Sequence, residues 1–359
     1  MKGSTSSALQ PPVFITGAGR SGTTLLRSIL SAHPRIAIAP ETHFMKTADR
    51  NGALQQGGPT NFEKFWKQFS TSTRFNDLGI DSDYCRHLIE QQDNTTYRSI
   101  LRAMLVAYGE RVGKERVGEK TPSHVRYIPL LLDWFPDARI LIMRRDPRAV
   151  MASKMKNPWV TRRLSPPSLR DGLLVGHRLY EIAYETNDWA ELYGRIAPAW
   201  EEEDRVLVVA YEALVKDPRS EVQRICRFLG EAYDPVMLSN RTSETVPEPE
   251  GEVSAAHLQE WRERHYAKTL RPISAEGLGK WKDRLTSTEV AVIEGGSKNG
   301  MEYYGYDFSR SRIQRGIGKT LYRALYGTGR TETVARSWLR KALHKIRGGA
   351  RAVNAKLRA

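Results

Sequence analysis

The chain alternates short apolar runs with longer stretches of helical periodicity. Four runs, mostly apolar and rich in β-branched residues, have the length and composition of buried strands. They cover residues 13–16, 35–39, 139–143 and 205–209. Helical periodicity covers residues 22–32, 127–135, 147–155 and 219–229. Strands that alternate with helices predict βαβ units, and therefore an α/β fold with a three-layer, P-loop-like parallel sheet flanked by helices.

Two long segments interrupt this alternation. Residues 46–115 are first rich in Gln, Asn, Gly and Thr and become helical from about Tyr84, which predicts an insertion or a cover on the acceptor side of the sheet. Residues 240–275 are rich in turn-forming residues and predict a long surface loop, a length typical of a lid. We expect one domain over residues 1–309, followed by a basic tail over residues 310–359.

Composition favours one sizeable core and no membrane span. The 359 residues are 40% hydrophobic, and no run of about 18 apolar residues is present. Residues 1–12 do not show the apolar segment of a signal peptide. Cys85 and Cys226 are too few for a disulfide framework and show no metal-ligand spacing, so we expect reduced thiols. A cytoplasmic protein without a metal is predicted.

The first predicted strand runs directly into a glycine-rich turn. This turn reads Gly17-Ala18-Gly19-Arg20-Ser21-Gly22-Thr23-Thr24 and precedes a helix. Backbone amides and the helix dipole together make such a turn a cradle for anions. The spacing is that of a Walker loop, G-x-x-x-x-G-K-S/T, but Thr23 stands where the lysine belongs and the loop carries its cation at Arg20. The missing lysine argues against a nucleoside-triphosphate enzyme.

A second candidate anion site follows the third predicted strand. Asp146 is a good N-cap and Pro147 suits the first helical position, so a helix is predicted to begin there. Arg145 lies just before the cap, and Ser153 lies on the second helical turn. Taken alone, these residues are more typical of a capped helix with an incidental serine.

The segment Gly19-Arg20-Ser21-Gly22-Thr23-Thr24-Leu25 resembles the 5′-phosphosulfate loop of sulfotransferases that use 3′-phosphoadenosine 5′-phosphosulfate (PAPS). It most resembles the branch that includes the tyrosylprotein sulfotransferases, and the similarity continues through Ala32-His33-Pro34 and Pro40-Glu41-Thr42. The resemblance implies sulfuryl transfer from PAPS, as co-substrate and without a metal, to an acceptor hydroxyl. It also implies that the loop binds the cofactor through Gly19, Arg20, Ser21, Gly22, Thr23 and Thr24.

The same resemblance implies further cofactor contacts. Arg145 and Ser153 have the spacing of the family's 3′-phosphate site, where a charge-assisted contact contributes about 1.5–3 kcal/mol. Tyr211, in Val-Ala-Tyr-Glu, resembles a family tyrosine that contacts the cofactor. Lys280, in Gly-Lys-Trp, resembles a family lysine that reaches the nucleotide phosphates. The order of these elements along the chain makes the resemblance specific.

The resemblance also implies catalytic roles. Glu41 takes the place of the base on the acceptor hydroxyl. Lys120, in Gly-Glu-Lys-Thr-Pro, matches a lysine near the bridging oxygen, and Arg20 is expected to serve the sulfuryl oxygens. His43 is an alternative base, and Glu119 is expected to be a structural ion-pair partner.

One position departs from the family pattern. The tyrosylprotein branch has an arginine four residues after the serine, where this chain has Asn157. Either Arg148, Lys154 or Lys156 replaces that arginine, or the 3′-phosphate is held with one charge fewer.

Most of the chain's positive charge lies in residues 310–359. This segment has 14 Lys and Arg against the single acid Glu332, a net charge of +13 out of +15 for the chain. Two basic amphipathic helices are predicted, over 313–325 and 334–346. Such helices often lie on anionic membranes, which predicts a peripheral membrane location. One alternative is that the helices pack on the domain. Another is that they bind nucleic acid, although no recognised nucleic-acid-binding motif accompanies the charge.

The nature of the acceptor follows only indirectly. The tyrosylprotein relatives reach the secretory pathway through a membrane anchor, and this chain shows none. We therefore expect a small molecule, glycan or glycolipid of the cytoplasm as the acceptor.

Two other function classes stay open at this point. A P-loop kinase with an atypical loop would turn over ATP with magnesium, and a non-catalytic nucleotide- or membrane-binding protein would bind the desulfated product PAP without transfer.

Overall fold

The computed structural model describes residues 10–49, 54, 58–59, 61–156, 177–239 and 272–326. By its internal contacts the chain forms two compact units. The first comprises Met1–Arg145 and Ile196–Leu278, and the second comprises Asp146–Arg195 and Gly279–Ala359. The expected domain over 1–309 and the tail boundary at residue 310 stay predictions. The predicted loop over 240–275 lies mostly outside the described residues, and so does the second predicted tail helix.

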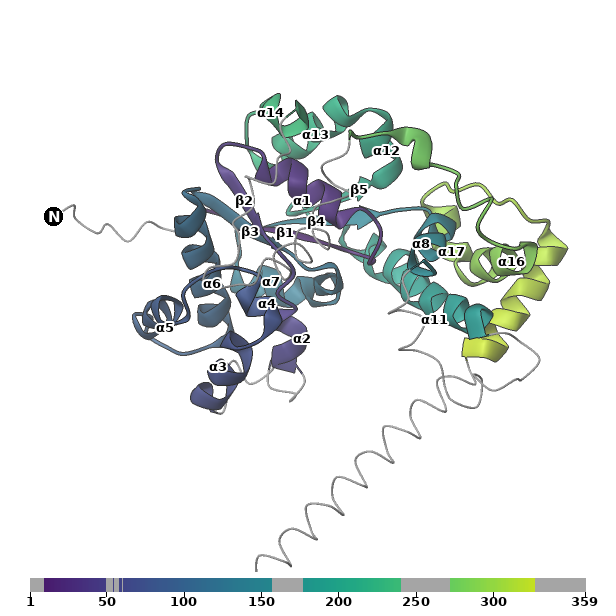
Figure 1. Cartoon of the computed structure of the whole chain (residues 1–359). Helices are drawn as coiled ribbons and strands as arrows, with labels where there is room; N and C mark the ends of the chain where they lie inside the picture. The colour runs from purple at the N-terminus through teal and green to yellow at the C-terminus, as the bar shows by residue number, and fades with distance from the viewer. Residues whose placement is uncertain are drawn as a thin grey trace, which may run out of the picture. The chain divides into compact units, whose positions relative to one another are not determined.

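The first unit contains a five-stranded, all-parallel sheet in the order β2-β3-β1-β4-β5 (Figure 1). Its strands are β1 (Val13–Gly17), β2 (Ile36–Ala39), β3 (Arg116–Lys120), β4 (Arg139–Arg144) and β5 (Val206–Ala210). In the central register Ile15 of β1 lies beside Lys120 of β3 and Leu141 of β4. All the carboxyl ends therefore meet at one edge, and the predicted α/β fold with a parallel sheet is confirmed.

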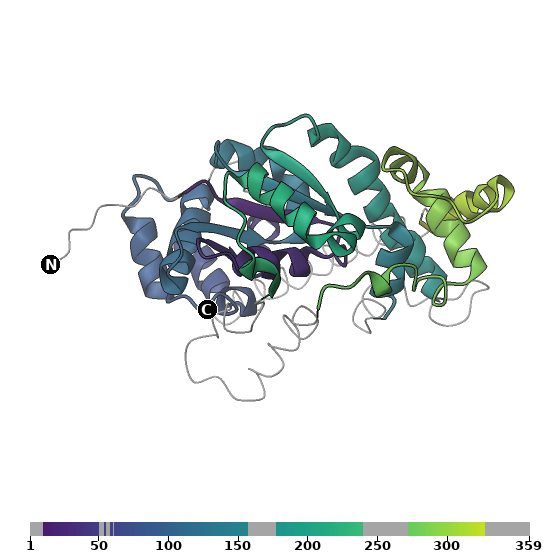
Figure 2. The same cartoon turned by 90° about the horizontal axis from the view of Figure 1, so that it is seen from above.

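Helices cover both faces of the sheet (Figures 1 and 2). On one face, Val13 and Ile15 of β1 belong to a buried apolar cluster that includes side chains from four helices. These helices are α1 (Thr23–Ser31), α12 (Tyr211–Lys216), α13 (Pro218–Leu229) and α14 (Val236–Ser239). On the other face Phe14 packs against Phe135, with ring centroids 5.7 Å apart. That face carries α6 (Tyr97–Val112) and α7 (Ile128–Trp134), so the predicted three layers are confirmed.

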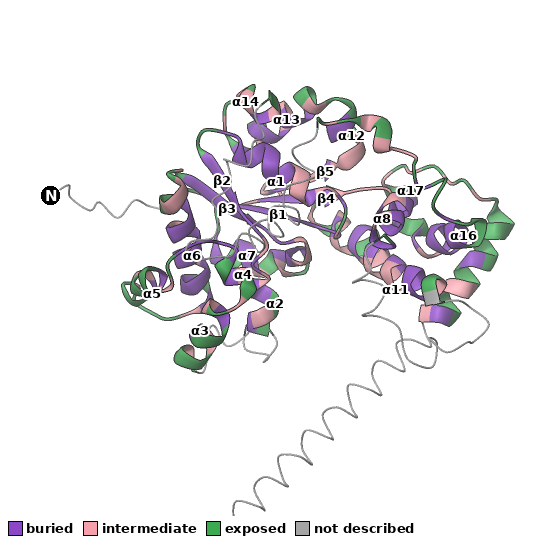
Figure 3. Cartoon of the chain, viewed as in Figure 1, coloured by how far each residue is buried: buried purple, intermediate pink, exposed green. Residues whose placement is uncertain are grey.

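The strand β3 was not among the predicted strands. Its sequence, Arg-Val-Gly-Glu-Lys, has no apolar run, yet every residue of it is buried (Figure 3). Gly118 permits the close approach of β1, because a Cβ there would lie 1.8 Å from the carbonyl oxygen of Val13. The polar residues of β3 are tolerated because each has a tertiary partner, as Arg116 does with the carbonyl oxygen of Pro11 at 3.0 Å.

The segment between β2 and β3 is helical from its start, earlier than predicted. Besides α6 it forms α2 (Phe44–Asp49), α3 (Phe62–Ser70), α4 (Thr73–Asn76) and α5 (Ser82–Glu90). The side chains of Asn61 and Ser72 cap α3 and α4. Phe44 and Phe69 pack edge to face at 5.3 Å within an aromatic cluster. The segment thus has its own small core, and its role as an acceptor-side cover stays a prediction.

Short turns of helix complete the connections. They are η2 (Pro122–Tyr127), η3 (Leu192–Ile196), η4 (Pro198–Trp200) and η6 (Ala275–Gly277). Among the helices that the structure describes, none combines the length and hydropathy needed to cross a bilayer.

The second unit is helical. Its described helices are α8 (Pro147–Lys154), α11 (His177–Glu191), α16 (Ser287–Gly296), α17 (Lys298–Tyr303) and residues 312–326. The side chain of Asp146 accepts a hydrogen bond from the Arg148 amide at 2.8 Å, which confirms the predicted cap of α8. Arg148 also donates to Glu294 of α16 at 2.8 Å. These contacts hold α8 against α16 within this unit.

Candidate active site

The glycine-rich turn between β1 and α1 is tightly wound. Gly17 has φ +131°, and a Cβ there would lie 2.3 Å from the carbonyl oxygen of Met143. Gly22, the N-cap of α1, has φ +105°, and a Cβ there would lie 2.5 Å from the ring of Tyr211. Ser21 donates its amide and its hydroxyl to the carbonyl oxygen of Ala18, at 3.2 and 2.6 Å. Glycine is therefore required at both ends of this turn.

The turn leaves the start of α1 suited to an anion. Within the part of the chain that the structure describes, no side chain caps the first turn of α1. The first amides of a helix have no intrahelical partner, and the helix dipole adds partial positive charge there. The predicted strand–turn–helix is confirmed. Binding of the 5′-phosphosulfate by Gly19, Thr23, Thr24 and their neighbours stays a prediction that this geometry suits.

Two guanidinium groups gather beside this loop. Arg20 adopts a left-handed backbone conformation with φ +72°, and its carbonyl oxygen accepts a hydrogen bond from Arg145 Nη1 at 3.3 Å. The guanidinium of Arg145 stacks on the ring of Tyr211, with its Cζ 4.0 Å from the centroid. The pKa of Arg20 is lowered because its guanidinium is partly buried and lies near the charge of Arg145, while Glu41 opposes the shift. Three predicted cofactor residues, Arg20, Arg145 and Tyr211, are thus brought together.

Glu41 and Lys120 meet at the same edge of the sheet. Strands β2 and β3 pair in parallel with Ala39 beside Glu119, so the residues that end them are neighbours. Lys120 Nζ donates to Glu41 Oε1 at 2.5 Å, and the two side chains are 2% and 24% exposed. Burial lowers the pKa of Lys120 although Glu41 opposes this. Burial alone would raise the pKa of Glu41, but Lys120 and His43 outweigh it and hold the pKa well below its usual range.

The alternative base, His43, lies against the same carboxylate. Its Nε2 is 3.1 Å from Glu41 Oε2, and its backbone has φ +50°, an uncommon conformation for a residue other than glycine. Glu41 therefore bridges Lys120 and His43 through its two oxygens. The geometry places both candidate bases in one cluster and leaves the choice between them to experiment.

A buried network around Glu119, the expected structural ion-pair partner, anchors the turn carrying Glu41. Thr42 donates its hydroxyl to the fully buried Glu119 at 2.5 Å, and its amide donates to the Thr121 hydroxyl at 3.2 Å. The Nδ1 atom of His124 lies 2.5 Å from the other carboxylate oxygen of Glu119. Neighbouring residues of a strand point to opposite faces, so Glu119 fixes this turn while Lys120 contacts Glu41. In the sequence, the feature that could have indicated this network is the adjacent pair Glu119-Lys120.

The remaining predicted cofactor residues belong to the second unit. Ser153 lies on α8 and is partly exposed, and Lys280 is an exposed residue just before the buried Trp281. Their binding roles stay predictions.

The candidates to replace the missing arginine differ in their partners. Arg148 is bound by Asp146 and Glu294 and stacks on Trp281 at 4.2 Å. Lys154 forms an ion pair with Glu185. Each of these cations thus has a carboxylate partner within the second unit. Lys156 is exposed, and Asn157 itself lies outside the described residues.

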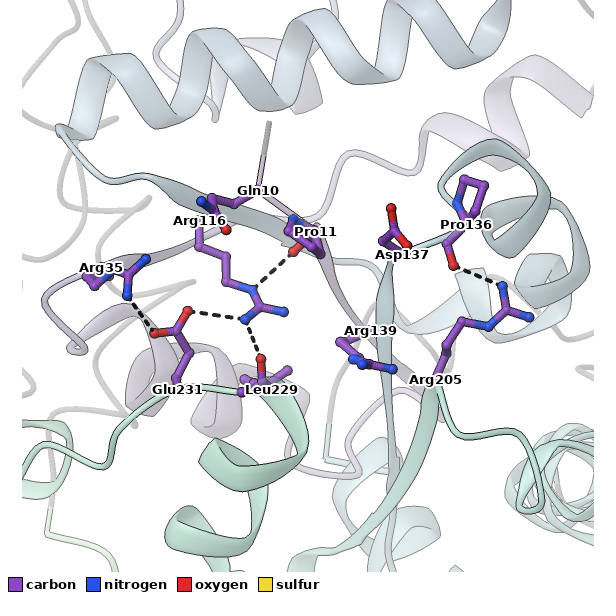
Figure 4. Close-up of a pocket in the computed structure, with 11 residues that line it drawn as sticks. Gln10, Pro11, Arg35, Arg116, Pro136, Asp137, Arg139, Arg205, Leu229 and Glu231 are labelled. Carbon is purple, nitrogen blue, oxygen red and sulfur yellow. Dashed lines mark hydrogen bonds and ion pairs between the residues drawn. The ribbon is translucent and has the colours of Figure 1, made fainter. Parts of the chain in front are cut away.

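A pocket of about 440 Å³ lies at the opposite, amino edge of the sheet (Figure 4). Its basic residues come from the starts of four strands and are Arg35, Arg116, Arg139 and Arg205. Arg116 donates to the carbonyl oxygens of Pro11 and Leu229 and pairs with Glu231 at 3.1 Å. Arg205 pairs with Glu203 at 2.7 Å and donates to the carbonyl oxygen of Pro136. Carboxylates pair with Arg35, Arg116 and Arg205, and Arg139 donates to a backbone carbonyl oxygen, so the cluster joins the strands to their neighbouring loops.

The fold and the carboxyl-edge cluster suit a P-loop-like group-transfer enzyme. No set of three or more His, Cys, Asp or Glu residues suited to a metal ion occurs in the described ranges. The family model described as "Sulfotransferase family" matches residues 11–235, and the chain belongs to this family. It is thus an enzyme of the sulfotransferase family that uses PAPS.

Individual relatives are distant. Protein-tyrosine sulfotransferase 1 of Danio rerio is 25% identical over 287 residues, which cover 79% of this chain and 70% of that protein. Nodulation protein NoeE of Sinorhizobium fredii is 26% identical over 78% of this chain and 62% of its own length. The sulfotransferase domain of the Synechococcus PCC 7002 olefin synthase aligns with a TM-score of 0.54 at 22% identity, over 83% of this chain and 95% of the domain. This last likeness confirms the fold.

Proposed function

We propose that the Glu41–Lys120 pair carries out sulfuryl transfer to an acceptor hydroxyl. The contact of 2.5 Å between Lys120 Nζ and Glu41 Oε1 is the observation that carries this assignment. It joins a carboxylate that can take a proton to an ammonium that can neutralise a leaving oxygen. Both groups lie at the carboxyl edge of the sheet, where β1 runs into the phosphate loop.

In this assignment the acceptor oxygen forms a bond to sulfur as the bond from sulfur to the 5′-phosphate oxygen breaks. PAPS, when bound, supplies the sulfuryl group. The Glu41 carboxylate takes the acceptor proton, and the Lys120 ammonium donates a hydrogen bond to the departing phosphate oxygen. Arg20 and the amides of the loop stabilise the charge on the sulfuryl oxygens.

The pair also offers a way to strengthen the base during the reaction. While Lys120 contacts the carboxylate, the pKa of Glu41 is held low and the group is a weak base. When Lys120 turns toward the leaving oxygen, Glu41 loses that stabilisation and its pKa rises. The base then becomes stronger in the same movement that neutralises the leaving group. His43, 3.1 Å away, can hold the second carboxylate oxygen throughout.

The loop, Arg145 and Tyr211, all of the first unit, would hold the nucleotide. Gly22 supports this part of the proposal, since a side chain there would collide with Tyr211 and fill the cradle. Arg145, which stacks on Tyr211 beside the loop, is our candidate for the 3′-phosphate.

We further propose that the acceptor is a small molecule, glycan or glycolipid, and that the protein works in the cytoplasm, peripheral to a membrane. Cys85 and Cys226 are buried and free, and burial raises their pKa values to about 12 and about 11. Inert free thiols suit a reducing compartment. Exposed apolar residues within 312–326 support the membrane location. A protein tyrosine, the acceptor in the names of several relatives, is the competing acceptor.

The test uses PAPS with a radioactive sulfuryl group. The wild-type protein and Glu41→Gln are each incubated with a lipid extract, a polar small-molecule extract and a tyrosine-containing acidic peptide. We expect label in the lipid or small-molecule fraction with the wild type only. Label in the peptide would replace our acceptor class, and equal labelling by Glu41→Gln would remove Glu41 as the base. Tighter binding of magnesium–ATP than of PAP would favour a kinase.

A further inference from the structure

Residues 312–326 form a helix that is packed on one side only. Gly318 lies against α16, where a Cβ would come 2.0 Å from the carbonyl oxygen of Ala291. Tyr322 donates its hydroxyl to Asn187 of α11 at 2.8 Å, and Leu325 is buried. These three residues recur every three to four positions, so they form one face of the helix. This face fastens the helix to the rest of the second unit.

The opposite side of the same helix exposes large apolar side chains. Ile313 is 78% exposed and Ile317 is 59% exposed, and they lie one turn apart. Ala324, also exposed, falls on the same stripe because it lies about three turns beyond Ile313. Figure 3 shows the exposed residues along this last described helix. Adjoining exposed apolar side chains that are rimmed by polar residues are typical of surfaces that bind a protein or a membrane.

Basic residues run beside this apolar stripe. Arg312, Lys319 and Arg323 are all exposed, and their spacing of seven and four residues places them on one neighbouring line of the helix. No acidic residue occurs between 310 and 326, and Glu332 is the single acid between 310 and 359. The exposed side is therefore both apolar and strongly cationic.

We propose that this exposed side of residues 312–326 docks onto an anionic phospholipid surface. Insertion of Ile313 and Ile317 at the level of the headgroups would remove their side chains from water, while Arg312, Lys319 and Arg323 remain among the phosphates. Charge complementarity selects this occupant. A second copy of the same face would bring cations against cations, and the remaining tail, residues 327–359, carries nine bases against one acid. The proposal rests on the membrane location proposed above and assigns it to one side of one helix, and docking requires no PAPS, so it can be tested apart from sulfuryl transfer.

The test is cosedimentation of the full chain with vesicles of phosphatidylcholine and phosphatidylserine, without PAPS. We expect the double variant Ile313→Asp, Ile317→Asp to bind at least about tenfold more weakly than the wild type, because it places charge where apolar contact is needed. The triple variant Arg312→Gln, Lys319→Gln, Arg323→Gln should bind on the order of 100-fold more weakly, about fivefold for each base.

A matched control removes the same charge elsewhere. Lys64, Lys67 and Lys216 are exposed residues of the first unit, and the triple variant with Gln at all three should bind vesicles within about twofold of the wild type. Equal losses in both triple variants would show that net charge alone attracts the protein. Unchanged binding by the isoleucine variant would overturn the proposal. The proposal would also be overturned if the wild type did not bind vesicles and the isoleucine variant had a lowered melting temperature. The stripe would then be covered within the protein itself.

Discussion

The two edges of the central sheet both gather arginines, but they use them differently. At the amino edge Arg116 and Arg35 lie against the carboxylate of Glu231, at 3.1 and 3.5 Å, and Arg205 pairs with Glu203. At the carboxyl edge Arg145 donates to a backbone carbonyl of Arg20 and stacks on a tyrosine. At the amino edge carboxylates lie against Arg35, Arg116 and Arg205, whereas at the carboxyl edge Arg20 and Arg145 lie side by side near a helix N-terminus, with Glu41 close to Arg20.

This difference predicts which arginines are structural and which bind an anion. The pKa of Arg116 is lowered by burial and by the neighbouring Arg139 and Arg35, while Glu231 opposes the shift through a hydrogen bond and its charge. Burial and the neighbouring Arg145 both lower the pKa of Arg20, and only Glu41 opposes this. An anion bound at the carboxyl edge would relieve the repulsion between these two cations. The partners of an arginine therefore indicate its role better than its presence in a pocket does.

The largest effect expected at the carboxyl edge is on turnover. Glu41→Gln keeps the size of the side chain and its place beside Lys120 but removes the basic lone pair. We expect kcat to fall about 10²–10⁴-fold, the usual contribution of a general base, with PAP affinity nearly unchanged. Transfer kinetics and PAP calorimetry measure the two. Wild-type turnover in Glu41→Gln, together with its loss in His43→Ala, would assign the base to His43.

At the amino edge the corresponding substitution should affect stability instead. Glu231→Gln leaves the buried guanidinium of Arg116 without its carboxylate, and the Glu231 side chain is itself only 5% exposed. We expect a loss of about 3 kcal/mol in the free energy of unfolding, with PAP affinity unchanged. Glu203→Gln is the matched control, because its pair with Arg205 is partly exposed and should contribute less than about 1 kcal/mol. Urea unfolding that ranks the two variants equally would contradict this view of the pocket.

The two edges can be compared directly with one arginine from each. Arg145→Ala should weaken PAP binding by roughly 1.5–3 kcal/mol. It should weaken the binding of adenosine 5′-phosphosulfate, which lacks the 3′-phosphate, far less. Arg139→Ala, at the amino edge, should change neither affinity. Calorimetry with both ligands measures the difference. Equal losses for both ligands in Arg145→Ala would show that this residue does not read the 3′-phosphate.

A last effect at the carboxyl edge is expected on the pH dependence of turnover. Lys120 helps to hold the pKa of Glu41 below its usual range, so Glu41 stays ionised well into acid. Lys120→Met removes that stabilisation and should raise the pKa. The acid limb of kcat/KM should then move about one to three units toward higher pH, on top of the lower turnover. Lys114, which donates to the carbonyl oxygens of His33 and Ile36, provides the control. Its change to Met should leave the acid limb in place.

Local patterns determined much of the fold and of the phosphate loop. The apolar runs at β1, β2, β4 and β5, the glycines at 17 and 22, and the Asp-Pro start of α8 each specify backbone conformation within a few residues. Such signals need no distant partner, because a β-branched run, a positive φ or an N-cap favours the same local structure in most contexts. Sequence similarity then added the roles expected of Glu41, Lys120, Arg20, Arg145 and Tyr211.

Tertiary structure decided what depends on partners far apart in the chain. The strand β3 is polar in sequence, and Glu41 and Thr42 find their partners Lys120 and Glu119 across 77 to 79 residues. The periodicity of residues 313–325 likewise predicted an amphipathic helix, but only packing showed that Gly318 and Leu325 face inward while Ile313 and Ile317 stay exposed. A buried polar group is stable only when another group meets its hydrogen bonds, and a helix face is buried only where a neighbour covers it. Both conditions belong to the folded chain, so no local pattern could have supplied them.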